Sequence, residues 1–212
     1  MESQEPQFKT PLQKRSRESL KRVYDATNDL LRDKDFDQIT ISQISKASSV
    51  AVGSIYQRFG SKDQLLWIMY QSYLEEANIL FINLLAGKGD EPRRERIENF
   101  LTTLCDLWET NRGIIRSLLV VFRRDPEEVP DYLKGHFLDA YENSAQYLLE
   151  PNPTEADIRH ARFVISMLLA NCREHIFYPA NQWGTAQGLS TEEFKSLLIP
   201  AAEAIMDSAK HL

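Results

Sequence analysis

Residues 51–59 place small and hydrogen-bonding side chains on one side of a short predicted helix. On a helical wheel with Ile55 at the buried centre, three residues fall within about 60° of it, namely Ala51, Val52 and Phe59. The opposite side is small and polar and consists of Gly53, Ser54, Tyr56 and Gln57. Such a face suits the major groove of DNA, because glutamine can form paired hydrogen bonds with adenine and serine can contact several base edges.

Three further features of this segment favour contact with a nucleic-acid backbone. Gly53 has no side chain, so the helix backbone could lie close to phosphates. Tyr56 can donate its hydroxyl to a phosphate oxygen, and Lys62, at the start of the next predicted helix, adds positive charge. The alternative is a surface helix whose polar side faces only water.

Helix-start signals surround this segment. Thr40-Ile41-Ser42-Gln43 and Ser61-Lys62-Asp63-Gln64 are capping boxes, in which a hydroxyl and a glutamine three residues later bond each other's backbone amides. Apolar residues with i, i+3, i+4, i+7 spacing predict an earlier helix over residues 16–32. A helix, a short turn at residues 48–50 and a second helix of this length form the helix-turn-helix pattern.

Helical periodicity also dominates the rest of the chain, and no alternating strand pattern of useful length is present. Further helices are predicted over residues 62–85, 93–110, 114–124, 130–150, 154–178 and 190–209. Segments rich in glycine, proline and polar residues separate them, and residues 179–188 are predicted to form a loop. The predicted fold class is therefore all-α, with about nine helices.

The net charge of −6 is unevenly distributed along the chain. Residues 1–62 carry 11 Lys or Arg against 8 Asp or Glu, whereas residues 63–212 carry 14 against 23. A basic head on an acidic body is typical of a chain with two roles, one of them contact with nucleic acid. Chance fluctuation in composition is the alternative.

Composition argues against several other classes of protein. No apolar run reaches the roughly 18 residues that a membrane span needs, and the N-terminus lacks the apolar core of a signal peptide. Cys105 and Cys172 are isolated in the sequence, so they form neither a disulfide framework nor a CxxC metal pair. We interpret them as reduced core residues rather than redox sensors. These features indicate a cytoplasmic protein.

Residues 16–66 resemble the DNA-binding head of the tetracycline-repressor (TetR) family of transcriptional regulators. The order and spacing of these residues carry the resemblance: Tyr24, Ala26, Thr27, Leu30, Leu31, Phe36, Ile39, Thr40, Ile41, Ile44, Ala47, Val50, Gly53, Ser54, Ile55, Tyr56, Phe59, Ser61, Lys62, Asp63, Leu65 and Leu66. The resemblance implies a disordered arm over residues 1–13, a three-helix DNA-binding domain over residues 14–62, and a helical effector-binding and dimerisation domain over residues 63–212.

By position, the resemblance implies a set of DNA contacts made by Thr40, Gln43, Val52, Gly53, Ser54, Tyr56, Gln57 and Lys62. The chain departs from the family pattern at Ser49, where a turn glycine is usual, at Ala51, where a serine cap is usual, and at Gly60, where proline is common. A left-handed Ser49 and a missing cap would each cost roughly 1 kcal/mol. Gln57 stands where an aromatic residue or histidine is frequent.

In the body, the resemblance implies a dimer interface and a ligand pocket. Apolar stripes on the last two long helices would form a four-helix interface with a second copy, through Ile165, Leu169, Cys172, Leu198, Ala201 and Ile205. These stripes could instead form intramolecular core. Apolar walls with a few fixed polar groups are typical of a ligand pocket, for which the candidates are Trp67, Tyr70, Trp108, Arg116, Phe122, His136, Phe137, Tyr141, Phe163, Asn171 and His175.

Motifs of known enzymes are absent from the sequence: it has no HExxH, P-loop, GxSxG or zinc quartet. Asp157-x-x-His160 is the nearest approach to the Glu-x-x-His motif of di-iron bundles, and it lies at a helix start. We therefore expect no enzymatic activity, cofactor, metal or membrane partner. A helical-bundle metalloenzyme remains the less favoured hypothesis.

The favoured hypothesis is a homodimeric, ligand-responsive repressor. Its two heads would bind a palindromic double-stranded operator in successive major grooves. A small, largely apolar effector in the body would then favour a head spacing that does not fit the operator. The alternative is an architectural DNA-binding protein that responds to no effector.

Overall fold

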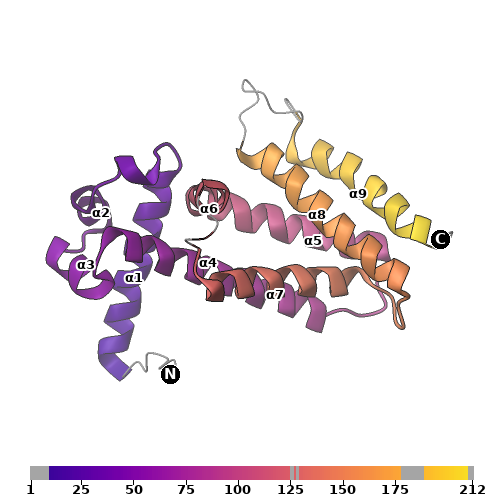
Figure 1. Cartoon of the computed structure of the whole chain (residues 1–212), viewed down its shortest axis with the longest axis horizontal. Coiled ribbons are helices and arrows are strands. Elements are labelled where there is room, and N and C mark those ends of the chain that lie inside the picture. Colours follow the sequence, from indigo (N-terminus) through magenta and orange to yellow (C-terminus); the bar gives the residue numbers. More distant parts are fainter. Residues whose placement is uncertain (1–9, 125–126, 128, 178–188, 210–212) are drawn as a thin grey trace. The chain divides into compact units, whose positions relative to one another are not determined.

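A computed structural model describes residues 10–124, 127, 129–177 and 189–209, without the side chains of residues 10–17, 121, 122 and 124. Within these residues every regular element is helical, in the order α1 to α9 with one short 3-10 turn, η1 (Figure 1). The chain divides into two compact units, residues 1–69 and residues 70–212, here called the head and the body. The all-α prediction with nine helices is confirmed for the described residues.

The head consists of four helical elements and the first residues of α4. They are α1 (Thr10–Leu31), η1 (Phe36–Gln38), α2 (Ile41–Ser48) and α3 (Val52–Phe59). Helix α1 packs on α2, and α2 packs on α3. Apolar side chains that are at most 6% exposed fill the space between them: Val23, Leu31, Ile39, Ile41, Ile44, Ile55 and Phe59. A small core of this kind fixes the orientation of α3 relative to α1 and α2.

The turn between α2 and α3 determines where α3 begins. Ser49 adopts the left-handed conformation, with φ 54°, at the position where the sequence predicted it. Ala51 has φ −58° and ψ 140°, lies outside the helix and is exposed, so our placement of Ala51 on the buried side of α3 is wrong. The helical wheel fails there because Ala51 is the N-cap residue, and its methyl group forms no capping hydrogen bond.

Six helices build the body. They are α4 (Lys62–Ala86, which begins in the head), α5 (Arg93–Thr110), α6 (Arg112–Arg124), α7 (Asp131–Leu148), α8 (Glu155–Phe177) and α9 (Thr191–Ser208). Helix α5 packs on α7, α8 and α9, and α8 packs on α7 and α9 (Figure 1). Helix α4 joins this bundle through the Phe81 and Phe100 rings, whose centroids are 5.2 Å apart.

Local hydrogen bonds explain several helix boundaries in the body. Thr154 and Asp157 form a reciprocal cap at the start of α8, with the Thr154 backbone amide donating to Asp157 Oδ2 over 2.8 Å. Ser190 and Glu193 form the same arrangement at the start of α9. Asn111 separates α5 from α6 and donates its buried side-chain amide to the Leu107 carbonyl over 3.0 Å.

Some predicted features fall partly or wholly outside the described residues. The predicted arm over residues 1–13 overlaps α1, which begins at Thr10, and its first nine residues lie outside the described part. The predicted loop over residues 179–188 also lies outside it. Among the helices of the described chain, none combines the length and the apolar character needed to cross a membrane.

Candidate DNA-binding face and body cavity

Helix α3 separates buried apolar side chains from exposed polar ones. Ile55 and Phe59 are 1% and 3% exposed and hold the helix against the head core. Ser54, Tyr56 and Gln57 are all exposed, as the wheel predicted for that side. The head therefore presents a hydroxyl, a phenol and a carboxamide together on one helical surface, all able to bond base edges or phosphates.

Gly53 lies within this surface, and the fold itself does not require a glycine there. A Cβ atom built on Gly53 would meet no atom within 4 Å. Glycine in a helix is destabilising by up to about 1 kcal/mol relative to alanine. Gly60 is different, because its φ of 71° and the Gln64 side chain both disfavour a Cβ atom. The absence of a side chain at Gly53 therefore suits an external surface that approaches the helix closely.

Thr40 and Gln43 are committed to the start of α2. The Gln43 backbone amide donates to Thr40 Oγ1 over 3.2 Å, and the Thr40 backbone amide donates to Gln43 Oε1 over 2.8 Å. The Thr40 hydroxyl also donates to Gln43 Oε1. These bonds occupy the side-chain carbonyl oxygen of Gln43. The side-chain amide nitrogen of Gln43 takes no part in the cap, and it is therefore the group suited to an external contact.

Lys62 begins α4, and its position is fixed by an aromatic ring. Its ammonium nitrogen lies 4.4 Å from the centroid of the Phe36 ring, a cation–π contact that sequence reasoning did not predict. Ser61, the preceding residue, accepts a hydrogen bond from the Gln64 backbone amide over 3.1 Å. The charge of Lys62 is therefore held at a helix N-terminus, where backbone amides also favour an anion.

A polar hollow of about 500 Å³ lies beside α3 within the head. Its walls come from α1, from the turn at residues 49–51 and from α3 itself. Arg22 and Arg58 belong to these walls, together with Ser54 and Gln57. The two arginines add positive charge near the polar face of α3, and sequence reasoning did not select either of them.

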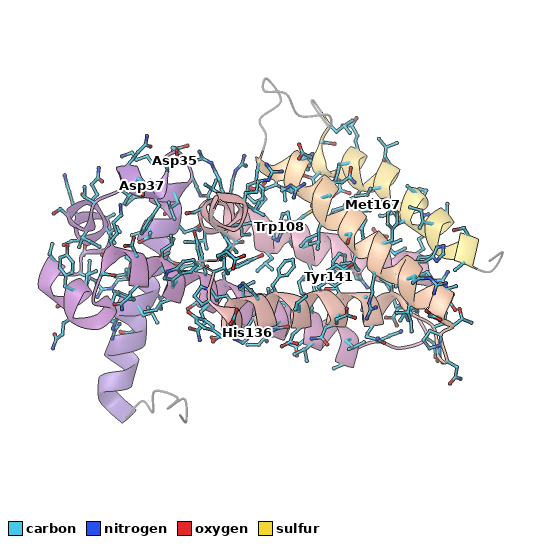
Figure 2. The ribbon with its side chains drawn as sticks, viewed as in Figure 1. Asp35, Asp37, Trp108, His136, Tyr141 and Met167 are labelled. Atoms are coloured by element: carbon cyan, nitrogen blue, oxygen red, sulfur yellow. The ribbon has the colours of Figure 1, made fainter. Side chains whose placement is uncertain are left out.

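A second, smaller cavity lies in the body among α4, α5, α7 and α8. Its volume is about 50 Å³, and its lining residues are uncharged: Tyr73, Leu74, Ala77, Phe81, Leu104, Trp108, Phe137, Ala140, Tyr141, Ser144 and Leu169. Trp108 and Tyr141 come from α5 and α7 and lie among the helices of the body (Figure 2). The Tyr141 hydroxyl also contacts the Ser166 hydroxyl on α8, over 2.9 Å.

Burial affects the phenol groups of the body. Tyr73 is 6% exposed, and burial raises the pKa of its phenol above the ordinary range, although a hydrogen bond from Trp108 opposes that change. Burial likewise raises the pKa of Tyr70, whose hydroxyl donates to the Ser117 hydroxyl over 2.9 Å. Both phenols are therefore neutral near pH 7, so the cavity wall carries no negative charge from Tyr73.

Comparison with known proteins identifies the head. Residues 23–67 match the family model described as bacterial regulatory proteins of the tetR family. The match covers the head alone, where the sequence follows the TetR pattern. None of the curated proteins matches the chain in sequence.

Solved structures of transcriptional regulators share the fold of this chain over most of its length. A TetR-family transcriptional regulator from Streptomyces coelicolor has a TM-score of 0.66 and 17% identity, covering 91% of this chain and 82% of its own. PfmR from Thermus thermophilus has a TM-score of 0.62 and 16% identity, covering 88% and 97%. FadR from Bacillus subtilis, solved in complex with stearoyl-CoA, has a TM-score of 0.52 and 12% identity, covering 89% and 96%.

The body cavity includes three of the predicted pocket residues, Trp108, Phe137 and Tyr141. The other described candidates do not line it: Trp67, Tyr70, Arg116, His136, Phe163, Asn171 and His175. Trp67 belongs to the head, Phe163 is 60% exposed, and the Phe122 side chain lies outside the described residues.

The contacts of these polar candidates account for some of their positions. The His175 ring stacks on Phe194 with centroids 4.3 Å apart, and burial lowers the pKa of His175. Asn171 is exposed and donates to the Met167 carbonyl over 2.8 Å. His136 on α7 accepts, through its backbone carbonyl, a bond from the Asn78 side chain. Our expectation of cationic or amide groups at the pocket wall is therefore not met by the lining of this cavity.

The predicted interface residues divide into two groups. Ile165, Cys172 and Leu198 are 0%, 0% and 8% exposed, so the chain's own core covers them. Ala201 is exposed, and Ile205 and Leu169 are half-buried, with Leu169 lining the cavity. Sequence periodicity placed all six on apolar stripes, but it could not tell which part of a stripe faces a neighbouring helix of the same chain.

Asp157 and His160 have local hydrogen-bond partners rather than each other. The Asp157 carboxylate accepts bonds from Thr154, which lower its pKa, and His160 Nδ1 lies 2.7 Å from the Ala156 carbonyl. Within the described ranges, no group of three or more His, Cys, Asp or Glu side chains is arranged to hold a metal ion.

Proposed function

We propose that this protein is a homodimeric transcriptional repressor that releases a palindromic operator when a small apolar effector binds its body. The exposed polar face of α3, with a glycine that the fold does not require, is the observation that carries the DNA-binding part. TetR-family regulators bind DNA and small-molecule effectors and form dimers. The position of each contact in this chain is part of the proposal.

DNA contacts are proposed for two groups of side chains. Ser54 and Gln57 lie on the exposed face of α3 and would bond base edges, with Gln57 best suited to adenine. Tyr56 and Lys62 would bond phosphates, and the Gln43 amide nitrogen would add a donor at the start of α2. Thr40 would act through its cap on α2, because its hydroxyl is already bonded to Gln43.

A dimer surface is proposed on the outer sides of α8 and α9. These helices pack together, and exposed or half-buried apolar residues follow one side of each: Phe163, Met167, Ala170, Leu197, Ala201 and Ala204. Phe163 and Leu197 are 60% and 64% exposed in the single chain. The alanines would let the helices of two copies approach closely, while the two large side chains would supply buried apolar area.

The effector site is proposed at the body cavity. A volume of about 50 Å³ is far below the 300–1,000 Å³ of typical ligand pockets, so binding would require the walls to move apart. Phe137 lines the cavity and is 46% exposed, which makes it the proposed entrance. The uncharged lining favours an apolar ligand, as does the stearoyl chain bound by the B. subtilis relative.

The proposed coupling runs along α4. This helix carries Lys62 at its start and contributes Tyr73, Leu74, Ala77 and Phe81 to the cavity wall. Ligand that separates α4 from its neighbours would favour a state in which the two heads of the dimer no longer match successive grooves. To shift the population toward that state, the ligand needs only to bind it more tightly than it binds the DNA-binding state.

We expect Gly53→Ala to stabilise the head and yet weaken DNA binding. The new methyl group meets nothing in the head, so α3 gains up to about 1 kcal/mol of helix stability. The same methyl group would separate the backbone from DNA, weakening binding roughly tenfold or more, which corresponds to about 1.4 kcal/mol. The wild-type protein is first used to select a preferred duplex from a random library, and the affinity of both proteins for that duplex is then measured. Hydrogen exchange of the α3 backbone amides measures the stability of the head.

Two variants provide controls for this measurement. Lys62→Ala should weaken binding to every duplex alike and reduce the salt dependence, whereas Gln57→Ala should relax preference at one base pair by roughly 1–3 kcal/mol. Unchanged binding in all three variants would show that α3 is not the reading helix. Selection that yields no preferred palindrome would instead favour the architectural alternative.

We expect uncharged apolar ligands to stabilise the protein. Decanol, decanoic acid and decyltrimethylammonium have the same chain length and differ in their head groups. At about 100 times its Kd, a ligand adds roughly 2.7 kcal/mol of stability, or about 5–10 °C in Tm for a chain of this size. The alcohol should produce such a shift and release DNA, because the uncharged lining has no charged partner for either the carboxylate or the cation.

Ala77→Leu tests whether the cavity is the site. Ala77 is 3% exposed and lines the cavity, so leucine fills it and should abolish the ligand-induced shift. Ala86→Leu is the matched control at the exposed end of the same helix and should retain the shift. Stabilisation by the cation alone, or an equal shift in both variants, would place the effector elsewhere.

A further inference from the structure

Asn78 on α4 carries a buried hydrogen-bond acceptor for which the described residues supply no donor. Its side-chain nitrogen, Nδ2, donates to the backbone carbonyl of His136 on α7 over 3.3 Å. A carbonyl can only accept, so the nitrogen of the amide and not its oxygen faces His136. The side-chain oxygen, Oδ1, is buried and has no hydrogen-bond partner among the described residues. Buried polar atoms are nearly always hydrogen-bonded, so this oxygen requires an explanation.

Asn78 lies on the side of α4 that forms the body cavity. Leu74, Ala77 and Phe81 of this helix line the cavity. Residues 74, 77, 78 and 81 have the i, i+3, i+4, i+7 spacing of a single helical face, so Asn78 shares that face. Its hydrogen-bond partner on α7 directly precedes Phe137, which lines the cavity and is 46% exposed. The Asn78 amide therefore joins α4 to α7 beside the proposed entrance of the cavity.

Two hydroxyl groups of the cavity wall on α7 already use their hydrogens. Ser144 donates its hydroxyl to the Ala140 carbonyl over 2.7 Å. Tyr141, labelled on α7 in Figure 2, donates its hydroxyl to the Arg162 carbonyl. The oxygens of these hydroxyls can still accept a hydrogen bond, as can Oδ1 of Asn78. This side of the cavity therefore suits a ligand whose polar end donates a hydrogen bond.

We propose that Asn78 is the polar contact of the effector, and that the effector is a neutral apolar molecule ending in a hydrogen-bond donor, such as a long-chain alcohol or primary amide. This inference rests on the proposed effector site. Binding there requires the cavity walls to move apart, and Asn78 lies on the face of α4 that such a movement opens to the ligand. A hydroxyl or an amide N–H would then supply the donor that Oδ1 lacks among the described residues.

The same oxygen would discriminate between classes of apolar ligand. An ether, an ester or an ionised acid has only acceptors at its polar end, so it would leave Oδ1 of Asn78 buried without a donor. An alkane would do the same. A primary alkylammonium has donors, but the uncharged lining of the cavity offers its charge no partner. A neutral donor at the end of an apolar chain is therefore the chemistry that this site favours.

Asn78→Leu separates a role in ligand binding from a role in folding. His136 lies inside α7, so its carbonyl also accepts the helical hydrogen bond from the amide four residues later. Leucine has a similar size, and it removes the unpaired oxygen together with one long hydrogen bond. We therefore expect the ligand-free variant to melt no lower than the wild type. If it melts clearly lower, the fold needs this amide, and the comparison of two ligands on the wild-type protein decides the proposal.

Decanol and methyl nonyl ether test the donor directly. They are isomers, but only decanol can donate a hydrogen bond. The dependence of Tm on ligand concentration gives the affinity of the full-length protein for each ligand. We expect the wild type to bind decanol roughly tenfold more tightly than the ether, and Asn78→Leu to lose this preference. Asn83→Leu, the same substitution at an exposed position of α4, should keep it.

The outcomes distinguish this inference from the proposed function. If the wild type binds the ether as tightly as decanol, or if Asn78→Leu keeps the preference for decanol, the role of Asn78 is overturned. The effector cavity then still stands, provided that Ala77→Leu abolishes the binding of both ligands. If neither ligand changes the Tm of the wild type, the effector cavity is overturned and the role of Asn78 with it, while the DNA-binding proposal is unaffected.

Discussion

Arg96→Ala is expected to destabilise the body by roughly 2–4 kcal/mol, because Arg96 is a buried cation with fixed partners. Its side chain is 2% exposed, donates to the Glu91 carbonyl over 2.7 Å and bonds the Glu150 carboxylate. Alanine would leave an arginine-sized space and remove a donor from the Glu91 carbonyl, and Glu150 would keep only its longer ion pair with Arg93, at 3.6 Å. Glu150 is half exposed, so water recovers part of the loss, and Tm should fall by about 5–10 °C.

Arg94→Ala is the matched control on the same helix. Arg94 also forms an ion pair, with its Nη1 atom 2.6 Å from Glu203 Oε2, but its side chain is 53% exposed. Exposed ion pairs contribute at most about 1 kcal/mol, so urea unfolding should show a much smaller change. Equal destabilisation by the two substitutions would mean that the burial of Arg96 does not determine its contribution to the stability of the body.

Leu197→Glu is expected to convert the proposed dimer to a monomer. Leu197 is 64% exposed in the single chain, so glutamate there does not disturb the fold of one copy. In the proposed interface, the glutamate would be a buried charge without a partner. This would weaken dimer formation by several kcal/mol, which raises the dimer dissociation constant at least a hundredfold. Sedimentation at micromolar concentration measures this, and operator binding should weaken in parallel.

Ile79→Glu is the control for this substitution. Ile79 is 60% exposed on α4, outside the proposed surface of α8 and α9, so its replacement should leave the dimer intact. A monomeric wild-type protein would contradict both the interface and the operator model that depends on it. Dissociation caused by Ile79→Glu and not by Leu197→Glu would place the interface on α4.

Sequence alone determined the secondary structure and the family of the head. Helix starts depend on neighbouring residues, so Thr40, Thr154 and Ser190 cap α2, α8 and α9 as their local patterns indicated. The polar face of α3 was also predictable, because a short helix with two buried side chains has one possible exposed side. The spacing that identified the TetR head is a local property of the same kind.

Tertiary structure decided which side chains from different helices meet. An apolar stripe on a helix shows that one side is buried, but not what covers it, and so Ile165, Cys172 and Leu198 belong to the chain's own core. The burial of Arg96 against Glu150 joins residues 54 positions apart. Such contacts depend on how whole helices pack, and periodicity within a single helix carries no information about its neighbours.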